Sequence, residues 1–60
     1  MRHTSYSEVG NLPLGSKFYL EDHPCEVVSQ SRSTQVHCVY IGARRGHIYL
    51  DVNEFVEVIS

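Results

Sequence analysis

The feature that most constrains the fold of this chain is its choice of apolar residues. Eight valines and three isoleucines stand against a single alanine in the 60 residues. β-Branched side chains lose rotamer freedom in a helix and pack well on a pleated sheet. The sequence therefore predicts an all-β protein and argues against a helical bundle.

The size and charge of the chain exclude several other classes of protein. A chain of 60 residues forms one domain at most and removes only about 60% of its surface from water on folding. That size leaves little room for a substrate cleft. The hydrophobic fraction of 42% and the net charge of -2 argue against a disordered chain. The same charge balance provides no general basic field that would attract polyanions.

Alternating apolar and polar residues predict five short strands separated by turns. The expected strands cover residues 17–20, 25–31, 35–41, 47–50 and 56–59. Asp51 is a suitable N-cap with Glu54 three residues later, which predicts a single 3₁₀ turn over 51–55, before the last strand. Strands this short bury an apolar face by curling, so we expect a small five-stranded antiparallel barrel.

The first eleven residues differ in character from the rest of the chain. They are polar apart from Tyr6 and Val9 and end in the turn-forming pair Gly10-Asn11. This composition predicts either a loose arm or a short edge strand. We therefore divide the chain into a flexible N-terminal arm, residues 1–11, and a barrel domain, residues 12–60.

The positions of the two central loops predict how the strands pair. A loop centred between Arg32 and Ser33 opposes Cys25 to Tyr40, Val27 to Cys38 and Ser29 to Val36. A loop centred on Arg44 opposes Tyr40 to Ile48 and Cys38 to Leu50. Both pairings place one set of residues on the inward face: Cys25, Val27, Val36, Cys38, Tyr40, Ile48 and Leu50. Four further residues are expected in the core: Phe18, Leu20, Phe55 and Val58.

The C-terminal part of the chain resembles an SH3 domain. Gly46-His47-Ile48, followed by Val52-Asn53-Glu54-Phe55-Val56-Glu57-Val58-Ile59, is similar to the Gly-aromatic-Ile strand, 3₁₀ turn and Val-rich last strand of that family. The resemblance implies an SH3-like barrel. The chain has no tryptophan, so much of the aromatic groove with which SH3 domains bind proline-rich peptides is missing.

The central strands resemble a second family. Pro24-Cys25-Glu26-Val27-Val28, with Val36-His37-Cys38-Val39-Tyr40-Ile41-Gly42, is similar to the N-terminal barrel of eukaryotic initiation factor five A and elongation factor P. The exposed loop of that family carries a modified lysine, and residues 31–34 contain none. This resemblance implies the same barrel without the translation activity. The size of the chain also resembles that of small accessory proteins of temperate bacteriophages.

The candidate binding residues are the aromatic and basic groups on the outward face and its hairpin tip. His37, His47 and Tyr49 point outward beside Val39, and Arg44 and Arg45 lie in the loop between the third and fourth strands. Aromatic and apolar groups on the outer side of a sheet indicate either a binding surface or a second core layer under the N-terminal arm.

Reactive side chains do not converge in the predicted fold. Neighbouring His37 and Cys38 point to opposite faces of one strand, so with His23 and Cys25 they do not form a zinc site. The cysteines lie diagonally on the inward face, as buried thiols or as a strained disulfide. Because the cysteines face inward and the histidines outward, we expect no enzyme activity, no metal and no cofactor.

These features predict a noncatalytic protein-binding module or small accessory protein, bacteriophage-encoded if the resemblance in size holds. One alternative is a nucleic-acid-binding barrel that uses Arg44, Arg45, Tyr19 and Tyr49. Another is a homodimer joined through an exposed edge strand, so the expected state is a monomer or a weak dimer. Two cysteines and the absence of a long apolar run indicate a cytoplasmic protein without membrane contact.

Overall fold

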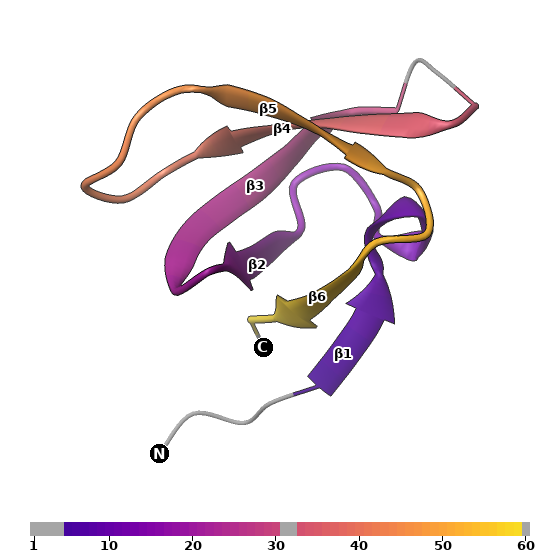
Figure 1. The fold of residues 1–60 in the computed structure, drawn as a ribbon, viewed down its shortest axis with the longest axis horizontal. Coiled ribbons are helices and arrows are strands. Elements are labelled where there is room, and N and C mark those ends of the chain that lie inside the picture. The colour runs from indigo at the N-terminus through magenta and orange to yellow at the C-terminus, as the bar shows by residue number, and fades with distance from the viewer. Residues whose placement is uncertain (1–4, 31–32, 60) are drawn as a thin grey trace.

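The structure, a computed structural model, describes residues 5–30 and 33–59, which form one six-stranded antiparallel sheet (Figure 1). Its strands are β1 (Ser5–Glu8), β2 (Lys17–Leu20), β3 (His23–Ser29), β4 (Gln35–Tyr40), β5 (His47–Asp51) and β6 (Phe55–Val58). The all-β class is confirmed. The predicted number of five strands is wrong, because residues 5–8 of the N-terminal segment pair with β6 as an edge strand.

The strand order in the sheet is β1-β6-β2-β3-β4-β5. Strands β2 to β5 follow one another as antiparallel neighbours, and β6 then returns to lie between β1 and β2. The sheet curls, so that β4 and β5 lie across the interior from β6 (Figure 1). Among the described residues β1 and β5 remain its two edges, so the sheet is open and does not close into the predicted barrel.

The course of the chain after β1 accounts for the open sheet. The 3₁₀ helix η1 (Val9–Asn11) turns into the interior, where it contacts β4 and β5. The Val9 side chain is fully buried, and the Gly10 N–H donates to the Val52 carbonyl at 2.9 Å. A Cβ on Gly10 would lie 2.7 Å from the Cβ of Val52, so this approach requires glycine. The contacts of η1 take the place of a β1–β5 ladder.

The predicted 3₁₀ turn before the last strand is also corrected. Strand β5 extends through Asp51, which leaves only residues 52–54 before β6. The Glu54 N–H donates to the Asp51 carbonyl at 2.9 Å and closes a simple turn. The Val52 N–H donates to the Thr34 carbonyl at 3.0 Å, and the Val52 carbonyl accepts from the Gly10 N–H. These long-range bonds hold the segment as a single turn, so the 3₁₀ helix of the described chain is η1 instead.

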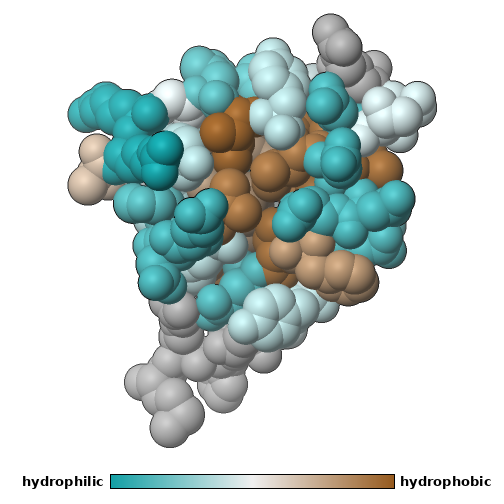
Figure 2. Space-filling model, viewed as in Figure 1, coloured by the Kyte–Doolittle hydropathy of each residue, from teal (hydrophilic) through white to brown (hydrophobic). Residues whose placement is uncertain are grey.

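The core lies between the curled halves of the sheet. Its buried members are Val9, Leu12, Phe18, Cys25, Val27, Val36, Cys38 and Val56. Partly buried side chains packed against them are Leu20, Tyr40, Ile48, Leu50, Val52 and Val58. Apolar side chains reach the surface in the middle of the face shown in Figure 2, between β5 and β6 as drawn in Figure 1. The open sheet therefore leaves part of its apolar interior in contact with water.

The predicted pairing of β3 with β4 is confirmed for Cys25 with Tyr40 and for Val27 with Cys38. A β-bulge between Val27 and Ser29 then shifts the register by one residue, so Ser29 opposes His37 and not Val36. The prediction failed there because a bulge adds an unpaired residue to one strand.

The predicted register of β4 with β5 is wrong by two residues. Cys38 opposes Ile48, and Val36 opposes Leu50, because the connecting loop is centred on Ala43 and not on Arg44. A shift of two residues leaves every side chain on its predicted face, whereas a shift of one would reverse them all. The predicted inward face is therefore confirmed despite the wrong register.

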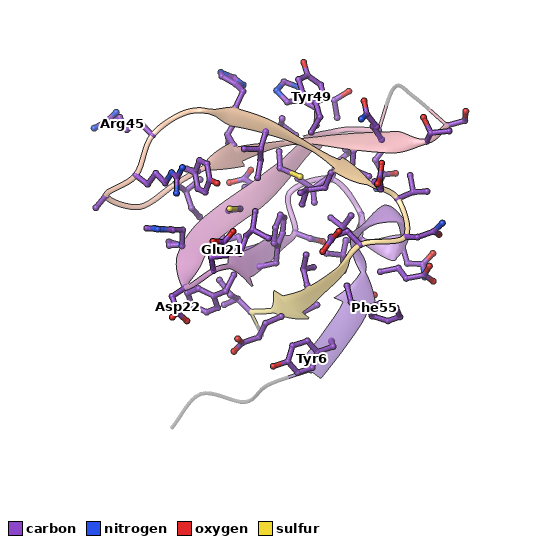
Figure 3. All side chains as sticks on the ribbon, in the orientation of Figure 1. Tyr6, Glu21, Asp22, Arg45, Tyr49 and Phe55 are labelled. Atoms are coloured by element: carbon purple, nitrogen blue, oxygen red, sulfur yellow. The ribbon has the colours of Figure 1, made fainter. Side chains whose placement is uncertain are left out.

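Phe55 is the exception among the predicted core residues. Its side chain is 65% exposed, whereas Val56 is only 2% exposed. Val56 opposes Ser7 and points inward, so its neighbour Phe55 points outward by the period of two in a strand. The aromatic residue of β6 thus lies on the outside of the sheet (Figure 3).

Candidate functional site

The candidate site is a cluster of three rings on the outer side of the β4–β5 hairpin, here called the hairpin surface: His37, His47 and Tyr49. His37 opposes Tyr49 directly. Their rings are stacked, with centroids 4.7 Å apart and planes inclined by 18°. The sequence prediction that these three side chains share one outward face is therefore confirmed by the register and the ring contacts.

The backbone ladder explains why this stack forms. The Tyr40 N–H donates to the Gly46 carbonyl at 3.0 Å, so Tyr40 and Gly46 belong to a hydrogen-bonded pair. Such pairs alternate with non-hydrogen-bonded pairs along an antiparallel ladder, which makes His37 and Tyr49 a non-hydrogen-bonded pair. Side chains of these pairs lie closer together, and two flat rings at this position stack.

The second histidine lies diagonally across the ladder. The Nε2 atom of His37 and the Nδ1 atom of His47 are 2.8 Å apart, a hydrogen bond in which one ring donates to the other. The ring centroids are 5.0 Å apart. His37 is thus held by both neighbours, and the three rings form one preordered surface.

The hairpin surface is open to solvent. The Tyr49 side chain is 57% exposed, and it points away from the sheet (Figure 3). Residues 5–11 do not cover it, because β1 pairs with β6 and η1 packs into the core. For the described part of the chain, the sequence alternatives of a binding surface and a covered second core layer are therefore decided in favour of an exposed surface.

The two predicted arginines are separated by the structure. The guanidinium carbon of Arg44 lies 5.0 Å from the centroid of the Tyr40 ring, a cation–π contact. Tyr40 packs against the core, so this contact draws Arg44 away from the hairpin surface. Arg45 instead lines a shallow pocket of about 370 Å³ together with His47 and Val39. Arg45 therefore extends the hairpin surface and Arg44 does not.

Both cysteines are free and fully buried. Burial, with a smaller contribution from the neighbouring Cys25, raises the pKa of the Cys38 thiol to about 11. Burial also raises the pKa of Cys25, against the lowering effects of a backbone hydrogen bond and Arg44. The thiols contact backbone carbonyls of their own strands, at 3.8 Å from Cys38 to Val36. The prediction of buried thiols is confirmed, and their protonated state disfavours a nucleophilic role.

Metal-binding groups are sparse in the described chain. Residues 5–30 and 33–59 contain no group of three or more histidine, cysteine, aspartate or glutamate side chains placed to hold a metal ion. His23 packs edge-on against the ring of Tyr40, with centroids 5.9 Å apart.

A second exposed aromatic surface on β1 and β6 was missed by the sequence analysis. Tyr6 is 67% exposed, and it lies on the outer face with Phe55 (Figure 3). Tyr6 opposes Glu57, which opposes Tyr19 of β2 on its other side. The alternation of Phe55-Val56-Glu57-Val58 carries the signal that could have found it, because two valines at alternate positions indicate the inward face.

Comparison with known proteins gives this chain no relative. No family model, no curated protein and no solved structure matches it. Within the described residues, no helix has the length and hydrophobicity needed to span a bilayer.

Proposed function

We propose that this protein is a noncatalytic binding module that engages an acidic, extended segment of another protein through the hairpin surface and Arg45. The observation that carries the proposal is the exposed stack of Tyr49 on His37. A tyrosine of this exposure that is already held by a neighbouring ring offers a large contact area at a small further cost in side-chain entropy. Such residues commonly provide most of the binding energy of an interface.

The charge around the hairpin surface favours an acidic partner. Arg45 and His47 line the same pocket at the loop end of the hairpin. The acidic pair Glu21 and Asp22 lies at the same end of the sheet but in a different turn, between β2 and β3, and is separate from Arg45 in Figure 3. Carboxylates on a partner would therefore find Arg45 and His47 at one end of the hairpin surface, although the chain as a whole has a net charge of -2.

The noncatalytic part of the proposal is supported by the separation of reactive groups. The two thiols are buried in the core with raised pKa values. The His37–His47 pair lies on the opposite, outer face of the same sheet. A thiol nucleophile and a histidine base therefore do not come within hydrogen-bond reach of each other.

We also propose that the fold is related to the SH3-like barrels. The curled sheet and the turn between the last two strands support this relation, since Gly46-His47-Ile48 leads into β5 and the Val-rich segment forms β6. The added edge strand β1 and the open sheet distinguish this chain from the five-stranded barrel of the prediction. The resemblance to bacteriophage accessory proteins stays a prediction.

The nucleic-acid alternative has weaker support from the geometry. It needs both arginines beside an exposed aromatic ring, and Arg44 is engaged with Tyr40. Arg45 alone remains, beside His47, to contact a phosphate backbone.

The proposal is tested by NMR titration with a short synthetic peptide that alternates glutamate with valine and tyrosine. We expect amide shift changes at the hairpin surface and Arg45, and Tyr49→Ala to weaken binding by about tenfold or more. Tyr6→Ala is the matched control, because Tyr6 is even more exposed than Tyr49 but lies on the opposite edge of the sheet.

Two results would contradict the proposal. One is an equal loss of binding in both variants, and the other is shift changes confined to other strands. If single-stranded DNA produces the same changes more strongly, with a steep salt dependence, the nucleic-acid alternative is correct instead.

A further inference from the structure

Strand β5 presents backbone groups that are arranged for pairing with another strand. The Gly46 carbonyl accepts from the Tyr40 N–H at 3.0 Å. This bond determines which residues of β5 direct their backbone groups toward β4 and which direct them away from it. By that alternation the N–H and C=O groups of His47 and Tyr49 and the N–H of Asp51 point away from β4, whereas the Asp51 carbonyl already accepts from the Glu54 N–H. In the ranges 5–30 and 33–59, β5 has a strand neighbour on one side only. Its outward backbone groups therefore form an open template for strand addition.

We propose that this edge is occupied by β5 of a second copy of the chain, in an antiparallel pair whose two-fold axis passes through Tyr49. In this register Tyr49 opposes Tyr49 of the second copy, and His47 opposes Asp51. Ile48 opposes Leu50 on the inward side. The pairing uses the backbone edge of β5, whereas the proposed function uses outer side chains, so either one can fail alone.

The charges along β5 select the antiparallel orientation. Arg45 and His47 lie at the start of the strand, and Asp51 ends it, with Glu54 shortly afterwards. Antiparallel pairing of two copies places the basic start of each strand beside the acidic end of the other. Parallel pairing would place like charges side by side, which opposes association.

The side chains of β5 fit the same arrangement on both faces. Ile48 and Leu50 are partly buried and face the core, so they would meet as an apolar pair across the new interface. The apolar opening shown in Figure 2 lies between β5 and β6 and would be narrowed by the second copy. On the outer face, the two exposed Tyr49 rings would become cross-strand neighbours.

The centre of the pairing follows from the length of the strand. With Tyr49 at the axis, all residues of His47–Asp51 are paired, and any other two-fold register leaves residues unpaired. The outward groups that have no partner within the described chain then supply about four intermolecular hydrogen bonds, two between the Tyr49 residues and two from the Asp51 N–H groups to the His47 carbonyls. The other edge strand, β1, has one charged residue, Glu8, so it lacks this internal complementarity.

The first test is sedimentation velocity over a concentration series, combined with isotope-filtered NMR on a mixture of labelled and unlabelled chain. We expect a reversible monomer–dimer equilibrium and an intermolecular contact from Tyr49 to Tyr49. Chemical synthesis of the 60-residue chain allows N-methylation of the Tyr49 amide. This change removes an outward donor without touching the β4–β5 ladder, so we expect the dimer to weaken by tenfold or more and the monomer to stay folded.

The matched control is N-methylation of Tyr6. The Val9 N–H donates to Glu54 at 2.8 Å, so the same alternation directs the Tyr6 amide outward from β1. We expect the dimer to survive this change. A sample that stays monomeric up to millimolar concentration overturns the proposal, and so does a dimer lost on methylation of Tyr6 but not of Tyr49.

A charge exchange tests the orientation. Asp51→Lys leaves the opposed positions 47 and 51 both basic and His47→Glu leaves them both acidic, so each variant alone should dimerise more weakly. Mixing the two should restore association as a heterodimer. Weakening by both variants without recovery on mixing overturns the antiparallel register.

Discussion

The Cys38 thiol shows at the residue scale how burial determines chemistry. Its side chain is fully enclosed between strands, and it stays protonated because a thiolate would lose its hydration. The burial of Cys38 in the core therefore also makes its thiol a poor nucleophile. His37, a single position away on β4, points to the outer face and is hydrogen-bonded to His47 of β5.

The raised pKa of Cys38 predicts a specific loss of stability in alkali. The pKa is raised from 9.0 to about 11, first by burial. The unfolded chain therefore loses its proton before the folded chain does, and stability falls as pH rises from about 9 toward 11. This shift in the pKa of Cys38 contributes about 3 kcal/mol at most to the free energy of unfolding. Urea unfolding of the parent and of Cys38→Ala should show a shallower decline in the variant, and an identical decline would contradict this account.

At the scale of a single strand, stability depends on which alternate residues point into the core. In β6, Val56 points into the core and Phe55 points to solvent. The larger aromatic residue is therefore expected to contribute less to stability than the smaller valine beside it.

This difference can be measured directly. Val56→Ala leaves a cavity in the core and should lower the free energy of unfolding by about 2 kcal/mol. Phe55→Ala should change it by about 0.5 kcal/mol or less, as for other exposed positions. Chemical denaturation of both variants checks the phase of β6. A larger loss for Phe55→Ala would show that β6 is shifted by one residue.

The comparison of β3, β4 and β6 shows what could be predicted from the sequence. The inward face of the central strands and the ring cluster of His37, His47 and Tyr49 follow from a period of two, which survives a shift of two residues. The bulge before Ser29 depends on local backbone geometry. The outward position of Phe55 follows from the same period of two, since Val56 points inward, and the prediction missed it because the turn predicted over 51–55 included Phe55.

At the scale of the whole molecule, the open sheet links stability to binding. A domain of 60 residues buries a small core and has a thin stability margin. Here β1 covers one side of β6, and η1 fills the interior, while β5 remains uncovered among the described residues. The uncovered edge and the exposed rings beside it are the features from which we infer both association and partner binding.

The central claim is the pairing of His37 with Tyr49, since the ring stack, the outward backbone groups of β5 and the proposed surfaces all depend on it. Residues of a non-hydrogen-bonded antiparallel pair bring their Cα atoms to about 4.5 Å, so their Hα atoms are in close contact. A nuclear Overhauser spectrum should therefore contain a strong Hα–Hα cross-peak between His37 and Tyr49. A cross-peak from His37 to Ile48 or Leu50 instead would place these rings on opposite faces and contradict the account.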